Sequence, residues 1–272
     1  MLFVDEAGQI SLANTVAVSQ AAKSVVLLGD PQQLEQPKRG SHPDGTDVSA
    51  LEHLLGEHQT MPENRGLFLE TTWRLHPAIC SFTSELFYES RLESRNGLDQ
   101  QRLCGDTPFR ASGLHFVPVE HEGNCNESPE EAVVVADLVT GLTREGIAWI
   151  TQNGEKKALT LQDVLIVAPY NAHVASILEH LPGGARVGTV DRFQGQEAPV
   201  VIYSMGTSSP ELAPRGMEFL YSLSRLNVAT SRARCVCILV ANPKLFEPEC
   251  RTPRQMKLAN AFCRYVEMAD TL

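Results

Sequence analysis

The sequence predicts an α/β fold in which parallel sheets are flanked by helices. Short apolar runs such as Val25–Leu28, Val164–Ala168 and Val200–Met205 indicate buried strands, and stretches with helical periodicity lie between them. This alternation of strand and helix favours a parallel sheet that is covered on both faces. A chain of 272 residues has room for one large domain or two ordinary ones.

The elements follow from these patterns in chain order. Strands are predicted at 1–5, 25–28, 67–70, 114–119, 164–168, 187–190, 200–205 and 235–241. Helices are predicted at 11–22, 48–55, 76–88, 128–144, 172–181, 222–231 and 254–268. The helix at 128 is well marked, because Ser128, Pro129 and Glu130 give a cap, a first-turn proline and an early acid in order. Polar stretches at 90–113, 145–160 and 207–217 are predicted to be loops.

Composition limits the class of protein. The net charge of −10 argues against a surface coated with lysines for nucleic acid, but it allows a local basic groove. No apolar run reaches the ~18–20 residues of a membrane span, and we find no signal peptide, so no membrane partner is expected. The seven cysteines are scattered. Cys235 and Cys237 are expected to be buried and structural, which indicates a reducing cytoplasm.

An acidic pair follows the first predicted strand. Residues 2–9 read LFVDEAGQ, so the apolar run ends in Asp5 and Glu6. An aspartate in this position suits a Mg²⁺ ion beside a nucleotide's phosphates, and a neighbouring glutamate suits the attacking water. The usual phosphate cradle is a glycine-rich loop that ends in Gly-Lys-Ser/Thr, yet none of the 19 glycines is followed by lysine. The chain therefore carries half of a nucleotide site.

Two further motifs fit that site. GDPQQL follows the second predicted strand, one strand–helix–strand unit after the acidic pair, and is expected to line the same pocket with Gln33. WRLHP precedes a predicted helix and contains Trp73 and Arg74. Arginine stabilises phosphoryl-transfer charge, and the indole can stack on a base or nucleotide ring. His76 in this motif is expected to cap or pack the helix.

Three motifs follow later strands. APYN at 168–171 and TVDRFQGQE at 189–197 each end a predicted strand in polar side chains. NVATSRAR at 227–234 places Arg232 at the end of a predicted helix, where an arginine can reach across a cleft.

These six motifs, in this order, resemble the superfamily 1 helicases, specifically the branch of RNA-decay and Okazaki-fragment processing helicases. VDEAGQ is similar to motif II, GDPQQL to motif III and WRLHP to the Tyr-Arg-Met-His-Pro motif. APYN, TVDRFQGQE and NVATSRAR are similar to motifs IV, V and VI. The stretch 119–128 is more weakly similar to bacterial members fused to a RecB-like nuclease. The resemblance implies RecA-like sheets, ATP and Mg²⁺ as cofactors, and single-stranded nucleic acid as partner, with DNA expected rather than RNA.

The resemblance also implies roles for single residues. Asp5 would hold Mg²⁺ and Glu6 would act on the hydrolytic water. Gln33 would sense the γ-phosphate, while Arg74 and Arg232 would contact phosphates from the two sides of the cleft.

The remaining implied roles concern the nucleotide and the strand. Glu197 would contact the nucleotide, and Trp73, which stands where the family has tyrosine, would keep a stacking role. Tyr170, Asn171 and Thr189 would face the nucleic acid.

The family pattern also sets an expectation for the missing half. Motif I, motif Ia and the adenine-recognising glutamine segment would precede Met1. The expected division is the end of a first RecA-like domain at 1–90, a linker at 91–112 and a complete second RecA-like domain at 113–272. The implied partners are the N-terminal helicase half and a RecB-like nuclease domain.

Two alternatives to an active motor stay open. One is a non-catalytic remnant that binds nucleic acid or protein. The other, a metal-dependent nuclease built on Asp5 and Glu6, fits poorly because it leaves GDPQQL, TVDRFQGQE and NVATSRAR without a purpose.

Overall fold

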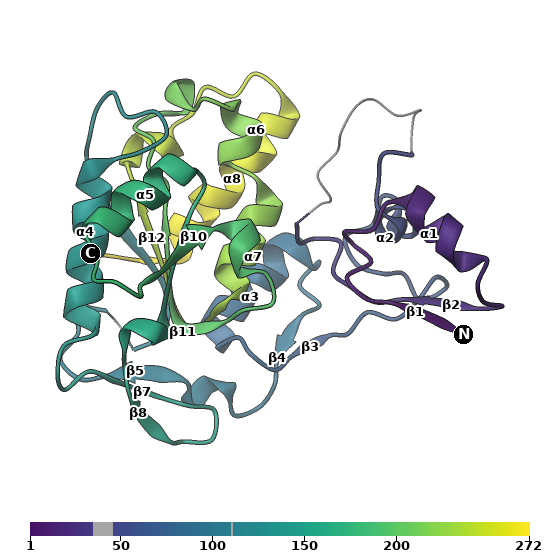
Figure 1. The fold of residues 1–272 in the computed structure, drawn as a ribbon, viewed down its shortest axis with the longest axis horizontal. Coiled ribbons are helices and arrows are strands. Elements are labelled where there is room, and N and C mark those ends of the chain that lie inside the picture. The colour runs from purple at the N-terminus through teal and green to yellow at the C-terminus, as the bar shows by residue number, and fades with distance from the viewer. Residues whose placement is uncertain (35–45, 110) are drawn as a thin grey trace.

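The fold consists of a small N-terminal unit and a larger unit beside it (Figure 1). The structure is a computed structural model and describes residues 1–34, 46–109 and 111–272. The smaller unit contains a two-stranded sheet and the larger one a six-stranded sheet. The predicted α/β class with parallel sheets flanked by helices is confirmed.

The large sheet has the strand order β10-β9-β11-β12-β6-β13, and every neighbouring pair is parallel. Its strands are β6 (Gly113–Pro118), β9 (Val164–Ala168), β10 (Arg186–Thr189), β11 (Ala198–Ser204), β12 (Ala233–Ala241) and β13 (Asp270–Thr271). Because all strands run the same way, their carboxyl ends meet at one edge of the sheet. That edge is where ligands of α/β proteins bind.

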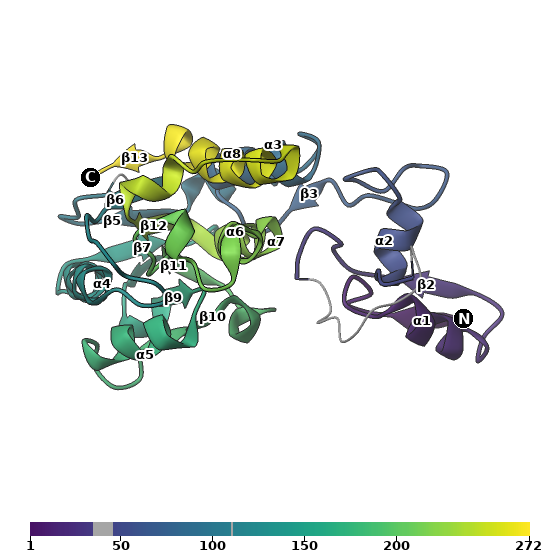
Figure 2. The same ribbon diagram turned by 90° about the horizontal axis from the view of Figure 1, so that it is seen from above.

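Helices cover both faces of this sheet (Figure 2). On one face lie α4 (Pro129–Leu142) and α5 (Asn171–Glu179). On the other lie α3 (Pro77–Phe87), α6 (Gly216–Leu220), α7 (Leu223–Ser231) and α8 (Pro253–Met268). Alternate residues of β12 enter the two cores: Cys237 and Leu239 face α3 and α8, whereas Val236 and Ile238 face α4. The expected burial of Cys235 and Cys237 is confirmed, and burial raises the pKa of each thiol to about 12.

The small unit is built around β1 (Leu2–Val4) and β2 (Val25–Leu27), which pair in parallel. Helices α1 (Leu12–Ser19) and α2 (Ala50–Leu55) accompany them. Helix α2 begins with a capping box: the Ser49 hydroxyl accepts from the Glu52 amide, and the Glu52 carboxylate accepts from the Ser49 amide. Each of these two hydrogen bonds pairs a backbone amide that the helix itself leaves without a partner.

The sequence prediction is wrong in several places, among them the predicted loop at 207–217, where α6 begins at Gly216. Residues 67–70 form no strand, because Leu67 and Leu69 are exposed, and the strand β3 follows at Thr71–Thr72. The predicted loop at 90–113 contains β4 (Glu93–Ser94) and β5 (Arg102–Cys104), with residue 110 outside the described part. The predicted loop at 145–160 is the hairpin of β7 (Ala148–Ile150) and β8 (Lys156–Ala158). Short 3₁₀ turns lie at Leu98–Gln100, Leu161–Asp163, Val190–Phe193, Pro210–Leu212 and Pro243–Phe246.

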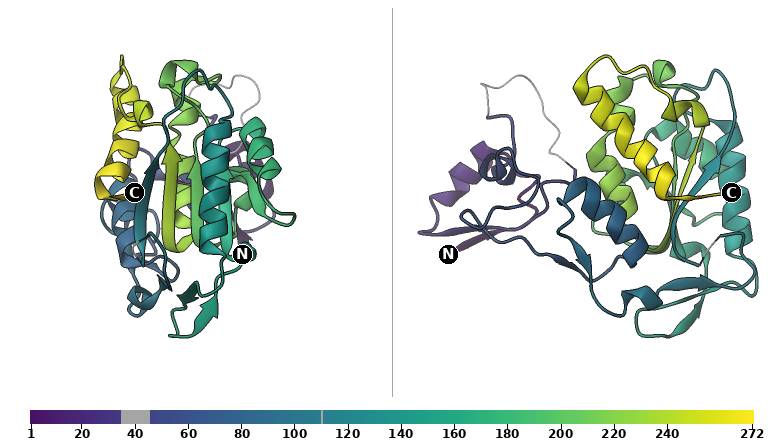
Figure 3. Two further views of the ribbon diagram at one scale, coloured as in Figure 1. Left: turned by 90° about the vertical axis from the view of Figure 1, so that its left-hand side faces the viewer. Right: turned by 180° about the vertical axis from the view of Figure 1, so that it is seen from behind.

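Helix α3 packs with the larger unit although it precedes the expected linker (Figure 3). Ile79, Phe82 and Phe87 of this helix are buried in the same core as β6 and β12. Strand β5 pairs antiparallel with β7 of the larger unit, so this part of 91–112 is integrated into the fold. The division into domains at 91–112 stays a prediction.

The small unit exposes apolar side chains around its two-stranded sheet. Phe3 is 63% and Leu28 46% exposed, and Val16 and Val18 of α1 are also exposed. Unpaired strand edges with apolar side chains favour association between chains. We therefore expect the 272-residue chain to self-associate at high concentration in sedimentation equilibrium. The variant Phe3→Glu should weaken this association, whereas Leu178→Glu on α5 should not; a monomeric wild-type chain at high concentration would contradict the expectation.

Candidate functional site

The turns that follow β1 and β2 pack directly against each other. The Ala7 amide donates to the Leu28 carbonyl at 2.8 Å. Gly29 has φ +153°, and a Cβ there would lie 2.9 Å from the Ala7 nitrogen. A Cβ on Gly8 would likewise lie 2.8 Å from the Asp30 carbonyl oxygen. Glycine at both positions thus allows the acidic turn and the GDPQQL turn to meet.

Asp5 and Glu6 lie at the tip of this pair of turns. Glu6 has φ 51°, an uncommon backbone conformation for a residue other than glycine, and its amide donates to Asp5 Oδ1 at 2.9 Å. Gln194 of the larger unit donates its side-chain amide to Glu6 Oε2 at 3.4 Å. Both acids are exposed, so their carboxylates are accessible from the space between the units.

Gln33 joins the two units through Arg232. Its side-chain amide donates to Asp30 Oδ2 at 2.9 Å, and its Oε1 accepts from Arg232 Nη2 at 2.9 Å. Arg232 caps the C-terminus of α7, as the sequence predicts. The structure therefore brings Gln33 and Arg232 together.

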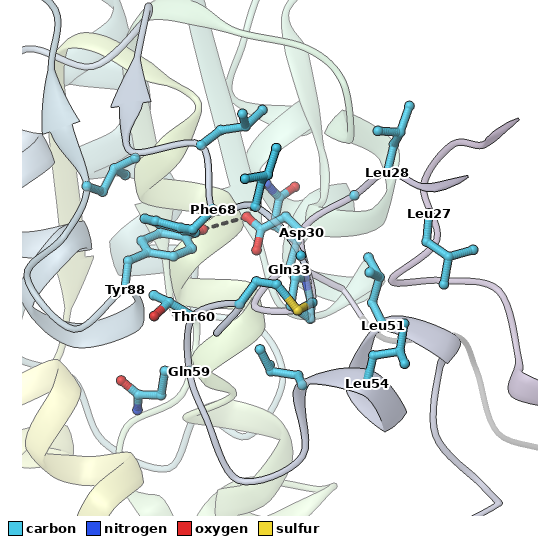
Figure 4. A pocket seen from close by; sticks show the side chains of 18 of the residues that line it. Leu27, Leu28, Asp30, Gln33, Leu51, Leu54, Gln59, Thr60, Phe68 and Tyr88 are labelled. Carbon is cyan, nitrogen blue, oxygen red and sulfur yellow. Dashed lines mark hydrogen bonds between the residues drawn. The ribbon is translucent and has the colours of Figure 1, made fainter. Parts of the chain in front are cut away.

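Tyr88, whose hydroxyl points toward Asp30 in Figure 4, forms a second, buried link together with Asn227. The Tyr88 hydroxyl donates to Asp30 Oδ2 at 2.5 Å, and Asn227 Nδ2 donates to the Gln32 carbonyl at 3.1 Å. Burial and the Asp30 carboxylate raise the pKa of Tyr88 well above its ordinary value, so the hydroxyl stays protonated and remains a donor. Asp30 and Gln33 also line a pocket of about 700 Å³ whose other walls are mostly apolar.

Arg74 and Glu197 form an ion pair that also includes Arg234. Arg74 Nε and Arg234 Nη2 each donate to one oxygen of the Glu197 carboxylate. Burial raises the pKa of Glu197, but the hydrogen bonds from Arg234 and Arg74 outweigh it and leave the pKa below its ordinary value. Arg74 Nη1 further donates to the Ser231 carbonyl at 3.2 Å. The Ser231 contact brings Arg74 beside Arg232.

Arg232 is a buried cation whose donors are only partly used. Its exposed fraction is 4%, and its Nε has no hydrogen-bond partner among the described residues. Burial, together with the neighbouring Arg74, lowers the pKa of Arg232. A buried guanidinium is costly unless it is paired. The arrangement beside Arg74 and Glu6 is therefore suited to an anion.

The WRLHP motif contributes one exposed and one structural side chain. Trp73 is 65% exposed, and the guanidinium of Arg95 lies 3.8 Å from its ring centroid. His76 caps α3, because its Nδ1 accepts from the Ala78 amide at 3.1 Å. The predicted capping role of His76 is confirmed.

The three residues expected to face nucleic acid lie at the carboxyl edge of the large sheet. Tyr170 precedes α5 and Asn171 is its first residue. Thr189 ends β10 and is in register with Ala168 of β9. Tyr170 is buried against Phe219, with ring centroids 5.3 Å apart, whereas Asn171 is exposed. Register thus brings the APYN and TVDRFQGQE motifs to one edge.

Sequence reasoning missed four residues that hold this site together. Asp30, Asn227 and Arg234 lie inside the motifs, but nothing in their spacing distinguishes them from their neighbours. Tyr88 lies in no motif and is placed here only by the packing of α3 on the larger unit.

The residues present fit a nucleotide with Mg²⁺. The described part of the chain contains no cluster of three carboxylate, imidazole or thiolate side chains that could hold a metal alone. Mg²⁺ is usually bound through one or two carboxylates together with substrate phosphates, and Asp5 with Glu6 meets that requirement. The free Nε of Arg232 is a suitable donor for a phosphate oxygen. Among the described helices, none is long and apolar enough to cross a membrane.

The sequence is similar to those of several helicases. One is the probable RNA helicase armi of Drosophila melanogaster, which is 29% identical over 89% of this chain and 23% of its own length. Another is the ATP-dependent helicase upf1 of Schizosaccharomyces pombe, which is 27% identical over 90% of this chain and 27% of its own length. The DNA polymerase alpha-associated DNA helicase A of the same yeast is 26% identical over 88% of this chain and 36% of its own length. The chain thus spans about a quarter to a third of their length.

A solved structure, the arterivirus nonstructural protein 10 helicase with DNA, aligns over 89% of this chain and 39% of that one, with a TM-score of 0.45 and 18% identity. Overlap at that level specifies no function. The family model described as an AAA domain matches residues 46–244. The chain therefore belongs to the AAA domain family and has helicases as relatives, which supports the expected place in helicase superfamily 1.

Proposed function

We propose that this chain is part of the motor of an ATP-dependent helicase or translocase that moves along single-stranded nucleic acid, 5′→3′ as its resemblance implies. The observation that carries the proposal is Arg232, a buried guanidinium with an unused Nε that lies beside Arg74. Gln33, on a turn of the other unit, contacts it directly. Two neighbouring guanidinium groups that face a turn of the other unit suit a triphosphate held between the units.

The side chains between the two units would then have separate roles in binding and hydrolysing ATP. Asp5 would hold Mg²⁺, and Glu6 would orient and deprotonate the hydrolytic water. Gln33 would report the γ-phosphate to Arg232 through their hydrogen bond. Arg74 and Arg232 would hold phosphate oxygens, since guanidinium donors match them geometrically. Bound Mg²⁺ would supply charge neutralisation at the phosphates.

Two residues would act beside the phosphates. Glu197 would contact the nucleotide while it holds Arg74 in place. Trp73 would stack on the nucleotide with the ring face that Arg95 leaves free.

The strand would run over the carboxyl edge of the large sheet. Tyr170, Asn171 and Thr189 would meet it there, with DNA proposed rather than RNA. The relatives include a protein named as an RNA helicase and one named as a DNA helicase. Binding measurements with single-stranded DNA and RNA therefore decide between the two nucleic acids. The N-terminal helicase half and a RecB-like nuclease domain are the proposed partners, and the cytoplasm is the proposed compartment.

We expect the 272-residue chain to hydrolyse ATP poorly even with single-stranded DNA and Mg²⁺, because it contains no Gly-Lys-Ser/Thr loop. Weak binding of a fluorescent ADP analogue should remain. The variant Arg74→Gln should weaken that binding about tenfold, since a charge-assisted hydrogen bond contributes roughly 1.5–3 kcal/mol. Arg144→Gln, on an exposed residue paired with Asp106, is the matched control and should bind as wild type.

Two results would count against these expectations. Robust turnover that Glu6→Gln abolishes would contradict the low activity of the chain. Nucleotide binding that is indifferent to both Arg74 and Arg232 would contradict the proposed triphosphate site, and would favour the alternative of a non-catalytic module that binds nucleic acid or protein.

A further inference from the structure

Two guanidinium groups lie against the ring of Phe219 in α6. The Cζ atom of Arg215 lies 3.8 Å from the ring centroid, and that of Arg225 lies 3.9 Å from it. Cation–π attraction to the shared ring holds these two like charges close together.

Among the residues that the structure describes, no acid pairs with either arginine. The nearby Glu218 is paired with Arg254 instead, at 2.8 Å. Two stacked guanidinium groups without a carboxylate form a local positive site on a chain whose net charge is −10. Such a site attracts an anion from solution.

Both arginines line a groove of about 960 Å³ between the two units. One wall comes from the GDPQQL turn at 31–34 and from Glu52 and Leu55 of α2; the other comes from α6, α7 and the start of α8, including Arg254 and Lys257. Of the described residues that line the groove, three are acids and four are cations: Glu52, Asp191 and Glu218 against Arg215, Arg225, Arg254 and Lys257. Glu52 already accepts from the Ser49 amide.

The groove continues toward the sheet edge described above. Phe219, which supports both arginines, packs against Tyr170 with ring centroids 5.3 Å apart. Asp191, in the turn after Thr189, lies on the groove wall. An extended ligand in the groove would therefore pass the GDPQQL turn, the paired arginines and the turn that follows β10.

We propose that Arg215 and Arg225 bind successive backbone phosphates of single-stranded nucleic acid, with Phe219 as the support that fixes them. This inference rests on the proposed function and extends its nucleic-acid surface to α6 and α7. The guanidinium group of arginine matches the geometry of phosphate and also stacks on aromatic rings. An arginine held by Phe219 can therefore still bind a phosphate. Because contacts to backbone phosphates carry no sequence information directly, we expect this contact to be independent of sequence.

The test is fluorescence anisotropy with a labelled oligo(dT), using the full 272-residue chain over a series of salt concentrations. Each phosphate contact on a single strand contributes about −0.7 to the slope of log K against log[salt]. Arg215→Gln should therefore reduce the slope by about 0.7, and Arg215→Gln/Arg225→Gln by about 1.4. At 0.1 M salt the same relation predicts binding about fivefold and about 25-fold weaker.

A matched control removes the same charge elsewhere. Arg102→Gln/Arg144→Gln changes two exposed arginines on β5 and after α4, far from α6 (Figure 1), and its slope should equal that of wild type. Arg215 is itself exposed, so the single variant tests the inference even if the double variant fails to fold. Oligo(U) should show the same losses as oligo(dT).

Two outcomes would overturn the inference. One is an unchanged slope in both groove variants, or no binding of oligo(dT) by the wild-type chain at low salt. The other is that Arg215→Gln weakens binding of poly-glutamate but not of oligo(dT). That result would make the groove a site for an acidic protein. Neither result alters nucleotide binding at Arg74 and Arg232, so failure here is distinguishable from failure of the proposed motor.

Discussion

Glu131→Ala is expected to lower the free energy of unfolding by about 3–5 kcal/mol, the usual cost of breaking a buried charged pair. Glu131 lies in the first turn of α4 and is fully buried. Its Oε1 accepts from His121 Nε2 at 3.0 Å. Its Oε2 accepts from the Ser204 hydroxyl at 2.6 Å and the Gly206 amide at 2.9 Å. Alanine would leave these donors without their acceptor.

The hydrogen bonds of His173 fix which of its ring nitrogens carries the proton. The Ser128 amide donates to His173 Nδ1 at 3.3 Å, so the proton of His173 is on Nε2, which donates to the Ser204 hydroxyl at 2.7 Å. Gly206, with φ +66°, packs on the His173 ring, and a Cβ there would lie 2.6 Å from it. The loops after β6 and β11 and helices α4 and α5 are thus joined through one carboxylate.

The pH dependence of this contribution has a definite sign. Burial raises the pKa of Glu131, but hydrogen bonds from His121 and His173 outweigh it and lower the pKa from 4.5 to about 2. A carboxyl with a depressed folded-state pKa stabilises the fold fully above its unfolded-state pKa, and this stability is lost as pH falls toward the folded value. The stability advantage of wild type over Glu131→Gln should therefore shrink between about pH 4.5 and 2.

Urea unfolding at pH 7 and at acidic pH measures both effects. Glu130→Gln is the matched control, because Glu130 is an exposed neighbour in the same turn, and it should change stability by less than about 1 kcal/mol. A loss below about 1 kcal/mol for Glu131→Ala, or a difference from Glu131→Gln that does not depend on pH, would contradict the role given to the carboxylate.

Apolar periodicity accounts for the elements that the sequence could predict. Strand β9 was predicted with its observed bounds, because Val164–Ala168 is apolar throughout and buried on both faces. Strand β8 was missed because Lys156–Ala158 is exposed along its whole length and pairs only through its backbone. Two leucines in residues 67–70 predict a strand, but the structure leaves both side chains exposed.

Some contacts of the candidate site could be predicted from the sequence and others could not. The pairing of the turns after β1 and β2 could be predicted, because consecutive parallel strands end at one edge. Contacts between the units could not, because they depend on how distant segments pack. Tyr88 reaches Asp30 across 58 positions and Arg225 reaches Phe219 from the next helix, and neither contact leaves a periodic signal in the sequence.

Arg232→Met should stabilise the unliganded chain by about 1 kcal/mol or more while it removes the response to phosphate ligands. Replacing a buried charge by an apolar side chain of similar volume is often neutral or stabilising by roughly 1–4 kcal/mol. Arg232 is 4% exposed, has an unused Nε and lies beside Arg74, so its burial is poorly compensated without an anion. A site kept at the expense of stability is the expected signature of function.

Thermal unfolding with and without inorganic pyrophosphate separates the two effects. Pyrophosphate should raise the Tm of wild type by mass action and leave that of Arg232→Met unchanged, whereas Arg144→Met should behave as wild type. In an assembled motor the same variant should lower ATP hydrolysis about 10³-fold or more. A variant less stable than wild type by over 1 kcal/mol, still stabilised by pyrophosphate, would show that Arg232 supports the fold and not the phosphates.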